Sequence, residues 1–383
     1  MTELLQDTAL ILISSMLLSL FFMTFNQPPL LGYILAGTCI GPAFAQVVGD
    51  AHILYVLGEF GLILLLFLVG LEISLEDFKK VWVQTVIFLA AQIFGCMVFA
   101  GMFSLFFGWS YAFTLLLSFI LTLSSTAVVI TLLENLGILQ SKTGSFSVSV
   151  LIAQDLALMP MIIIIRSLNS ESSGVSNLFT LMLALVLLIF AVLYFSKQPT
   201  ETKTKLYYKS LLKRPEITTL IGASVCFTFA SIADLFKLSP AYGAFLAGLM
   251  LGNRWDRELL TKAFIPITSM MMMVFFISVG LRVSLEFMLN NIWLILLALV
   301  ITLSGKMLIN ILGLVLIRWP LRSTIFVAGL LAQMSEFSFV LIEEASKNNI
   351  LNTYHADFLV CLATLSLAVG SVLPLVIKAL RDG

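Results

Sequence analysis

Three charged residues lie inside apolar stretches long enough to cross a membrane: Asp155, Glu336 and Lys306. A charge at mid-bilayer costs about 2.5–3.5 kcal/mol on insertion scales, so it persists where it is paired, hydrated or used by the protein. We interpret Asp155, which follows the uncharged Gln154, as a functional group. Burial disfavours an ionised carboxylate, so a proton and a monovalent cation can compete for it. For Lys306 a functional and a structural role stay open, since pairing with a carboxylate serves both, whereas Glu336 better fits a structural salt bridge or a neutral buried carboxyl.

A carboxylate that binds an alkali cation needs neutral oxygen ligands beside it, because hard cations prefer oxygen. The stretch LTLSSTAVVI offers three consecutive hydroxyls, and LLAQMSEFSFV offers polar groups at the corresponding depth of the second half of the chain. The sequence predicts a site for a proton and an alkali cation on Asp155. Its further ligands would be Gln154, Ser124, Ser125 and Thr126, with Lys306, Glu336 and Gln333 in support.

Both polar stretches are poor continuous helices. Three adjacent hydroxyls cannot share one helical face, and Ser and Thr side chains offer the backbone local alternatives to a helix. Back-bonding inside an intact helix would explain either stretch alone, but the recurrence at equivalent places favours two interrupted helices. An interrupted helix releases carbonyls and amides at membrane depth, where transporters use them to bind ions.

The composition describes the scaffold that must hold these groups. The chain is 60% hydrophobic and only 11% charged, with a mean hydropathy of +1.08, which indicates an all-α polytopic membrane protein. The 4 cysteines and 2 histidines show no metal-ligand spacing. Apolar runs predict thirteen membrane spans, at residues 6–25, 28–45, 53–71, 81–107, 111–133, 143–166, 178–196, 216–233, 238–252, 262–281, 290–317, 322–343 and 355–378.

The chain also encodes one half twice. FNQPPLLGYILAGTCIGP at 25–42 matches FKLSPAYGAFLAGLMLGN at 236–253, with the glycines and one proline in register. Internal repeats at this hydropathy are typical of transporters whose substrate site lies between the halves, near the bilayer midplane.

We predict a single transmembrane domain over residues 1–383 with two repeats, at about 6–166 and 216–378. A helix at 178–196 and a basic loop at 197–215 would join them. An odd number of spans separates equivalent elements, so the repeats are expected to be inverted relative to each other.

The positive charges predict the orientation. Most of the 21 Lys and Arg residues fall in loops that would be cytoplasmic if the N-terminus lies outside, as the positive-inside rule requires. We therefore expect an integral protein of the plasma (inner) membrane, surrounded by lipid, with its N-terminus outside and its C-terminus in the cytoplasm.

Several segments together resemble the second family of monovalent cation:proton antiporters: PLLGYILAGTCIGP, LTLSSTAVV, LIAQDLALMP, FFISVGLRV and QMSEFSFVL. The Gln-Asp pair resembles the Kef-type potassium/proton branch, and the resemblance covers essentially the whole chain. It implies a thirteen-helix, NhaA-like fold with two crossed interrupted helices in a rocking core domain, a dimerisation domain and a homodimer. It makes Asp155 the cation-binding carboxylate, places Ser124–Thr126 in the first interrupted helix and pairs Lys306 with the acidic site. Gln154 stands where electrogenic relatives carry a second aspartate.

The sequence departs from the Kef pattern in two places. Kef-type proteins usually carry a cytoplasmic nucleotide-binding domain after the last helix, whereas this chain ends at Gly383 without a G-x-G-x-x-G motif. We therefore expect either a separate regulatory subunit or domain, or a shortened chain. The glycine that usually precedes the glutamate of the second interrupted helix is Ser335, which leaves the role of Glu336 open.

The expected function is secondary transport, with no enzymatic activity, no cofactor and no nucleic-acid partner. The protein would exchange a monovalent cation for protons by alternating access, with potassium favoured over sodium by the Gln-Asp pair and one titrating carboxylate making exchange electroneutral. A sodium/proton antiporter or a gated potassium efflux channel on the same scaffold remains an alternative. An intramembrane aspartyl protease would need two apposed carboxylates, and a carrier of organic solutes would need further buried charges.

Overall fold

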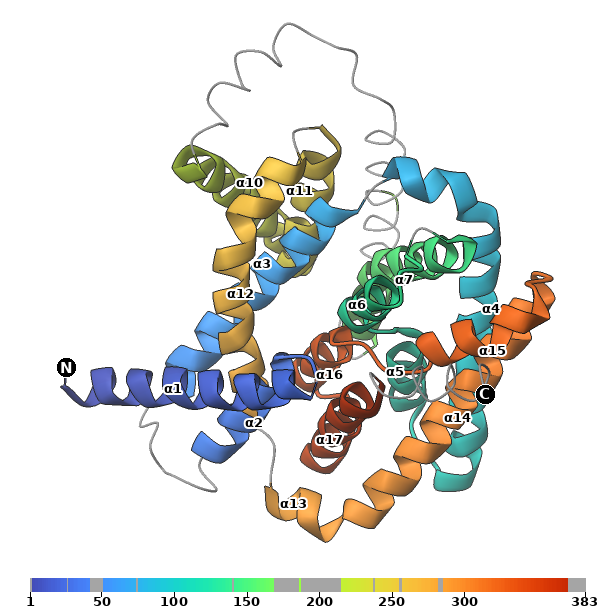
Figure 1. Cartoon of the computed structure of the whole chain (residues 1–383). Coiled ribbons are helices and arrows are strands. Elements are labelled where there is room, and N and C mark those ends of the chain that lie inside the picture. Colours follow the sequence, from blue (N-terminus) through green and yellow to red (C-terminus); the bar gives the residue numbers. More distant parts are fainter. Residues whose placement is uncertain are drawn as a thin grey trace, which may run out of the picture. The chain divides into compact units, whose positions relative to one another are not determined.

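The computed structural model describes residues 2–25, 27–41, 51–73, 75–139, 141–168, 186, 215–236, 238–254, 257–281 and 285–370. Within these ranges every regular element is a helix, and the chain divides into two compact units that are described separately below (Figure 1). The first unit comprises Met1–Gly49, Val81–Asn169 and Val279–Gly383; the second comprises Asp50–Lys80 and Ser170–Ser278.

The first unit contains most of the described helices. They are α1 (Thr2–Thr24), α2 (Leu30–Ile40), α4 (Leu75–Phe107), α5 (Tyr111–Thr122), α6 (Thr126–Asn135), α7 (Lys142–Ser167), α13 (Leu285–Asn290), α14 (Ile292–Leu316), α15 (Leu321–Leu330), α16 (Phe337–Lys347) and α17 (Thr353–Gly370). Within this unit α16 lies against α5, α7 and α17, and α14 lies against α15 (Figure 1).

The second unit is built on α3 (Ala51–Glu72), α10 (Pro215–Leu235), α11 (Pro240–Arg254) and α12 (Arg257–Leu281). Helix α11 packs on both α3 and α10. Glycines allow the close approach of α3 and α11: a β-carbon on Gly248 would overlap the carbonyl oxygen of Phe67, and one on Gly70 would overlap that of Phe245. Small residues at a helix contact are a common way to pack helices in a membrane, where lipid gives no hydrophobic drive for association.

The helices agree with the predicted spans where the structure describes them. Each predicted span coincides with one or two described helices except 178–196, which lies almost wholly outside the described residues, as does the basic loop. Six described helices are long and apolar enough to cross a membrane: Val83–Phe107, Lys142–Ser167, Glu216–Leu235, Arg257–Leu281, Ile292–Leu316 and Thr353–Gly370. The protein is therefore an all-helical polytopic membrane protein.

Two of the predicted spans are interrupted, as their polar stretches indicate. The span at 111–133 is divided between α5, which ends at Thr122, and α6, which begins at Thr126. The span at 322–343 is divided between α15, which ends at Leu330, and α16, which begins at Phe337. We call residues 123–125 the first break and residues 331–336 the second break. Both lie in the first unit.

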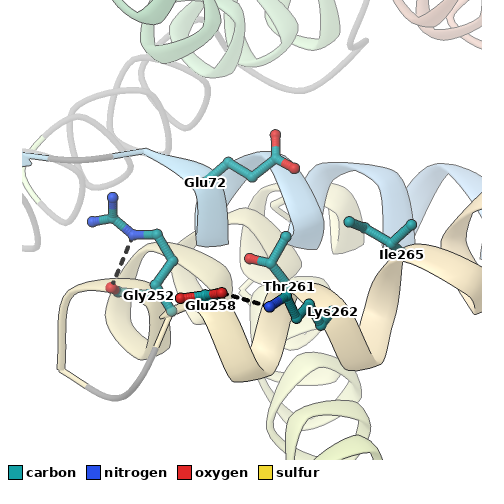
Figure 2. Close-up of a pocket in the computed structure, with 7 residues that line it drawn as sticks. Glu72, Gly252, Glu258, Thr261, Lys262 and Ile265 are labelled. Atoms are coloured by element: carbon teal, nitrogen blue, oxygen red, sulfur yellow. Dashed lines mark hydrogen bonds and ion pairs between the residues drawn. The ribbon is translucent and has the colours of Figure 1, made fainter.

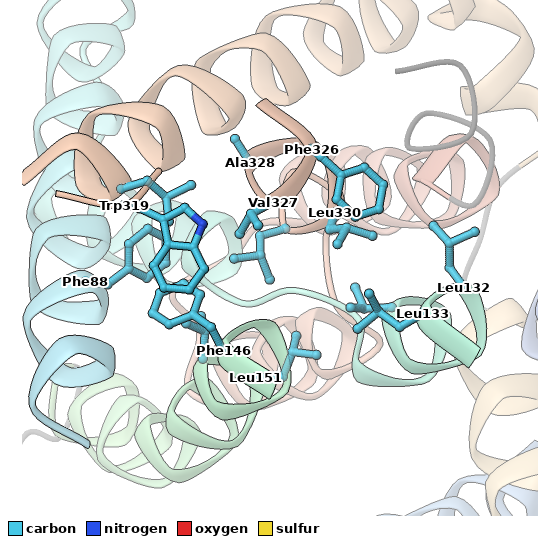
Figure 3. Packing of buried hydrophobic residues seen from close by; sticks show 14 residues of the cluster. Phe88, Leu132, Leu133, Phe146, Leu151, Trp319, Phe326, Val327, Ala328 and Leu330 are labelled. Atoms are coloured by element: carbon cyan, nitrogen blue, oxygen red, sulfur yellow. The ribbon is translucent and has the colours of Figure 1, made fainter. Parts of the chain in front are cut away.

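An apolar cluster holds the half-helices α6 and α15 against α4 and α7 (Figure 3). Its aromatic centre is Phe146, whose ring stacks on Trp319 at a centroid distance of 4.3 Å and meets Phe88 edge-on at 5.9 Å. Rings in such pairs stabilise a structure beyond the area that they bury. The cluster thus packs α6, which follows the first break, and α15, which precedes the second break, against the rest of the unit.

The close packing of α3 on α11 makes Gly248 sensitive to any side chain. We expect Gly248→Val to lower the melting temperature of the detergent-solubilised protein markedly, because the overlap with the Phe67 backbone forces the two helices apart; overpacking typically destabilises by about 1–3 kcal/mol, sometimes more. The matched control is Gly101→Val in α4, where an added β-carbon meets nothing within 4 Å. Thermal unfolding followed by size-exclusion chromatography compares the two variants, and equal melting temperatures would contradict the packing argument.

Candidate functional site

Asp155 lies at the first break, on α7. Its side chain is 7% exposed, and Oδ2 accepts a hydrogen bond of 3.3 Å from the hydroxyl of Thr126. Thr126 is the first residue of α6, so the carboxylate stands beside the N-terminus of a half-helix. The partial positive charge at a helix N-terminus stabilises an anion there. An acidic group in this position can hold either a proton or a cation.

Gln154, the neighbour of Asp155, bonds to the backbone of the first break. Its Oε1 accepts a hydrogen bond of 2.9 Å from the backbone N–H of Ser124, and the side chain is fully buried. This N–H has no helical partner because α5 has ended at Thr122. The sequence predicts Gln154 as a further ligand of the cation; in the structure its Oε1 bonds to Ser124 and its Nε2 donates to Gln92.

The three consecutive hydroxyls in the first break and at the start of α6 serve different partners. The Ser124 hydroxyl donates to the Leu331 carbonyl oxygen at 2.9 Å and so ties the first break to the second. The Ser125 hydroxyl caps α6 by accepting from the Val128 N–H at 3.4 Å. Thr126 therefore brings its hydroxyl to the carboxylate, while Ser124 and Ser125 satisfy the backbone that the break exposes.

Lys306 connects the two breaks from α14. The side chain is only 1% exposed, and its amine donates to the carbonyl oxygens of Leu123 and Gln333, the second at 2.7 Å. Leu123 directly follows the last residue of α5, and Gln333 lies just beyond the end of α15. The C-terminal end of a helix carries partial negative charge and so favours a cation. The resemblance pairs Lys306 with the acidic site, whereas the hydrogen bonds of the amine run to backbone carbonyls.

The second break carries the other predicted carboxylate. Glu336 is 8% exposed, lies at the N-cap of α16 and is next to the hydroxyls of Ser125 and Ser335. Its Oε2 and both amide atoms of Gln333 find no hydrogen-bond partner among the described residues. Buried polar atoms normally have a partner, so these positions suit a proton, a water molecule or an ion.

The charges of the site follow the half-helix dipoles. Asp155 and Glu336 stand at the N-terminal ends of α6 and α16, and Lys306 stands at the C-terminal ends of α5 and α15. Each charge therefore lies where the local dipole stabilises it. The amine of Lys306 is thus held by backbone carbonyls, and its position does not depend on an ion pair with a carboxylate.

A second candidate is an open pocket of about 520 Å³ in the second unit (Figure 2). Three of its four charged residues have partners: Lys262 pairs with Glu258 at 2.5 Å, and Arg257 donates to the carbonyl oxygens of Gly252 and Ile73. The fourth, Glu72, is exposed. The side chains of Lys262 and Glu258 are 70% and 75% exposed. A pocket so open lacks the burial that makes a carboxylate compete for a proton, and the first unit remains the better site.

The family described as "Sodium/hydrogen exchanger, transmembrane" matches residues 10–379. The chain belongs to this family. The predicted resemblance to the second family of monovalent cation:proton antiporters is thereby confirmed, and the protein is a transporter of cations and protons and not an enzyme.

Two sodium/hydrogen exchanger relatives cover most of this chain. The "Iron transporter MagA" of Paramagnetospirillum magneticum is 33% identical over 348 residues, which are 90% of this chain and 79% of that protein. The "Glutathione-regulated potassium-efflux system protein KefC" of Escherichia coli K12 is 30% identical over 368 residues, which are 92% of this chain. The chain spans only 57% of the length of KefC.

The solved structures support the exchanger fold. The sodium proton antiporter MjNhaP1 from Methanocaldococcus jannaschii at pH 8 matches with a TM-score of 0.71 over 99% of this chain and 98% of that chain, at 16% sequence identity. At this identity the match establishes the antiporter fold alone.

Several buried polar residues at the candidate site were not predicted from the sequence. Gln92 on α4 and Asn310 on α14 are fully buried and hydrogen-bonded to each other, and the Ser366 hydroxyl accepts from the Met334 N–H in the second break at 2.9 Å. All three are uncharged residues inside apolar helices. The sequence shows each of them as an amide or hydroxyl inside an apolar span, but it does not show which group that side chain bonds to.

The contacts of Lys306 predict how the protein responds to its removal. Lys306→Met should lower the melting temperature, because two buried carbonyls at helix ends lose their donor and each orphaned acceptor costs about 1–3 kcal/mol. The control is Lys262→Met, whose side chain is 70% exposed and whose loss should change little.

A double variant separates the two roles considered for Lys306. If the lysine mainly neutralises Asp155, adding Asp155→Asn to Lys306→Met should restore the melting temperature. The carbonyl contacts predict no restoration. Thermal unfolding in detergent measures both variants against the wild type, and a full rescue would show that the carboxylate is the partner that matters.

Proposed function

We propose that the protein is a secondary transporter that exchanges a monovalent cation, preferably potassium, for protons at Asp155. The observation that carries the proposal is a buried carboxylate at the N-terminus of an interrupted helix, in a chain that belongs to the sodium/hydrogen exchanger family. Glu336 is comparably buried and lies beside the Ser125 hydroxyl, and what distinguishes Asp155 is its contact with Thr126 together with its place in the Gln-Asp pair.

The mechanism follows from competition at one group. A proton neutralises the carboxylate of Asp155 by bonding to one of its oxygens. A cation neutralises it by electrostatic attraction, with the Thr126 hydroxyl and water as further oxygen ligands. Either form is easier to bury than the bare anion, which costs several kcal/mol at membrane depth. Because only the neutralised site moves readily between the two sides of the membrane, the flux of cation becomes coupled to the flux of protons.

Potassium is the favoured cation on two grounds. The Gln154–Asp155 pair resembles the Kef-type branch, and a relative that is 30% identical is described as a potassium-efflux system. The relative described as an iron transporter makes ferrous iron a useful comparison cation. Among the described residues no group of three or more His, Cys, Asp or Glu side chains is placed to hold a metal ion, which favours the alkali cation.

The proposal extends to topology and assembly. We propose thirteen membrane spans in inverted repeats, an external N-terminus and a cytoplasmic C-terminus in the plasma (inner) membrane, and a homodimer. Single cysteines introduced as Ser141→Cys and Asn348→Cys and labelled from each side of the membrane test the orientation, because these residues lie in loops predicted on opposite sides.

The activity is tested in proteoliposomes. A trapped pH-sensitive dye reports proton movement after a potassium, sodium or ferrous gradient is imposed, and the initial rates at several cation concentrations give KM and kcat. Cation flux that leaves the internal pH unchanged would instead identify a channel.

Asp155 provides the sharpest variant. We expect Asp155→Asn to fold and insert, because it removes a charge that the bilayer disfavours, but to reduce exchange to the level of protein-free liposomes. Glu258→Gln removes a carboxylate that is 75% exposed and serves as the control, which should retain exchange. Exchange that survives in Asp155→Asn would overturn the assignment of the site.

Counting carboxylates predicts the stoichiometry. Gln154 cannot titrate, so a site that alternates between one proton and one cation on Asp155 moves equal charge in both directions, and exchange is electroneutral. Valinomycin would confound a potassium carrier, so currents on a solid-supported membrane are the appropriate measurement. We expect no sustained transport current from the wild type or from Glu336→Gln. A current whose sign follows the cation gradient, and which disappears in Glu336→Gln, would show that a second carboxyl titrates.

A further inference from the structure

A continuous chain of amide hydrogen bonds runs through the first unit behind the site. It begins at the Ser124 N–H in the first break, which donates to Gln154 Oε1 at 2.9 Å. Gln154 Nε2 donates to Gln92 Oε1 at 2.8 Å, and Gln92 Nε2 donates to Asn310 Oδ1 at 2.8 Å. Asn310 Nδ2 donates to the carbonyl oxygen of Ala328 in α15 at 3.2 Å, where the chain ends. The three amide side chains are 0% exposed and come from α7, α4 and α14.

The two backbone groups at the ends set the direction of every bond between them. A backbone N–H can only donate, so Gln154 must turn its oxygen to Ser124; a carbonyl can only accept, so Asn310 must turn its nitrogen to Ala328. Gln92 must then accept from one neighbour and donate to the other. The orientation of each amide is thus determined by its partners, although nitrogen and oxygen of an amide look alike in most structures.

We propose that Gln92 and Asn310 are positioning residues of the cation site. Through Gln154 they fix the backbone at Ser124, and with it the register of Thr126 and the carboxylate that follows Gln154 in the chain. This inference rests on the proposed exchange at Asp155. Gln92 and Asn310 carry no charge and lie on helices other than that of Asp155, yet by this inference they contribute to the affinity for the cation.

Physical reasons favour a role in affinity over general stability. Gln154 and Asp155 are adjacent on α7, so a shift of the Gln154 amide moves the backbone that carries the carboxylate. In a buried chain each bond polarises the next, and a gap leaves a donor and an acceptor unsatisfied on either side. The chain also joins the first break to α15, which leads into the second break, so the ligands at the two breaks keep one relative position.

The test measures cation KM, kcat and melting temperature for purified variants in proteoliposomes. Gln92→Met keeps the volume but removes both hydrogen bonds, and Asn310→Leu does the same at the next position. We expect each to raise KM about tenfold, of the order of one lost buried hydrogen bond, with a smaller change in kcat. The control is Thr85→Val, also on α4, whose fully buried hydroxyl finds no partner among the described residues and whose removal should leave KM unchanged.

The double variant decides whether the residues act as one chain. If Gln92 and Asn310 act through the same bonds, Gln92→Met combined with Asn310→Leu should raise KM no further than either alone, whereas independent effects would multiply to roughly a hundredfold. Where Gln92→Met does not fold, Gln92→Asn keeps the amide but is one methylene too short to reach both partners, and it should give a smaller rise in KM.

The outcomes separate this inference from the proposed function. A wild type without cation-dependent proton flux would overturn the exchange function itself. A functional wild type whose Gln92 and Asn310 variants show lowered melting temperatures but unchanged KM would leave the exchange function standing and overturn the positioning role. If the two substitutions raise KM multiplicatively when combined, each residue acts alone, and the inference that they act through one hydrogen-bonded chain is overturned.

Discussion

A helix that stops in the middle of a membrane leaves backbone groups that can bond only to the protein itself. The first unit contains two such interruptions, and its polar side chains are arranged to satisfy them. Lys306 holds a carbonyl from each break, the Ser124 hydroxyl reaches from the first break to the Leu331 carbonyl of the second, and Ser366 accepts from the Met334 N–H. The two breaks are thus bonded to each other through side chains.

This constraint explains why the chemistry is located where it is. Ending α5 and starting α6 at membrane depth creates a helix N-terminus, and Asp155 occupies it through Thr126. The same interruption creates a C-terminus whose carbonyl attracts a cation, and Lys306 occupies that. A continuous helix would offer neither place. The placement of the charges is therefore a consequence of the interruption, and the apolar cluster around Phe146 packs α6 and α15 against α4 and α7.

The sequence predicted the interruptions and the buried carboxylate, because both leave local signals: adjacent hydroxyls, which suit a helix badly, and a charge in an apolar run. The hydroxyl contact of Thr126 with Asp155 also agrees with the expected ligand set. The partners of Lys306 and Gln154 could not be predicted, since a long side chain selects its partner from whatever the fold brings near, and backbone groups leave no mark in the sequence. Gln92 and Asn310 were passed over for a related reason, because an isolated amide looks equally well suited to lipid-facing, packing or bonding roles. The predicted span at 178–196 and the basic loop that follows it lie almost wholly outside the described residues.

The contacts of Gln154 change how a preference for potassium has to be explained. The Gln-Asp pair by itself suggests that both residues face the ion, but the oxygen of Gln154 is directed at Ser124. In the proposed mechanism, an amide in that place acts on the ion by setting the backbone from which the carboxylate and Thr126 project. The proposed preference for a larger, weakly hydrated cation would then depend on the spacing and stiffness of those oxygens. On this view cation preference depends on how firmly the two breaks are tied together as well as on which residue stands before the aspartate.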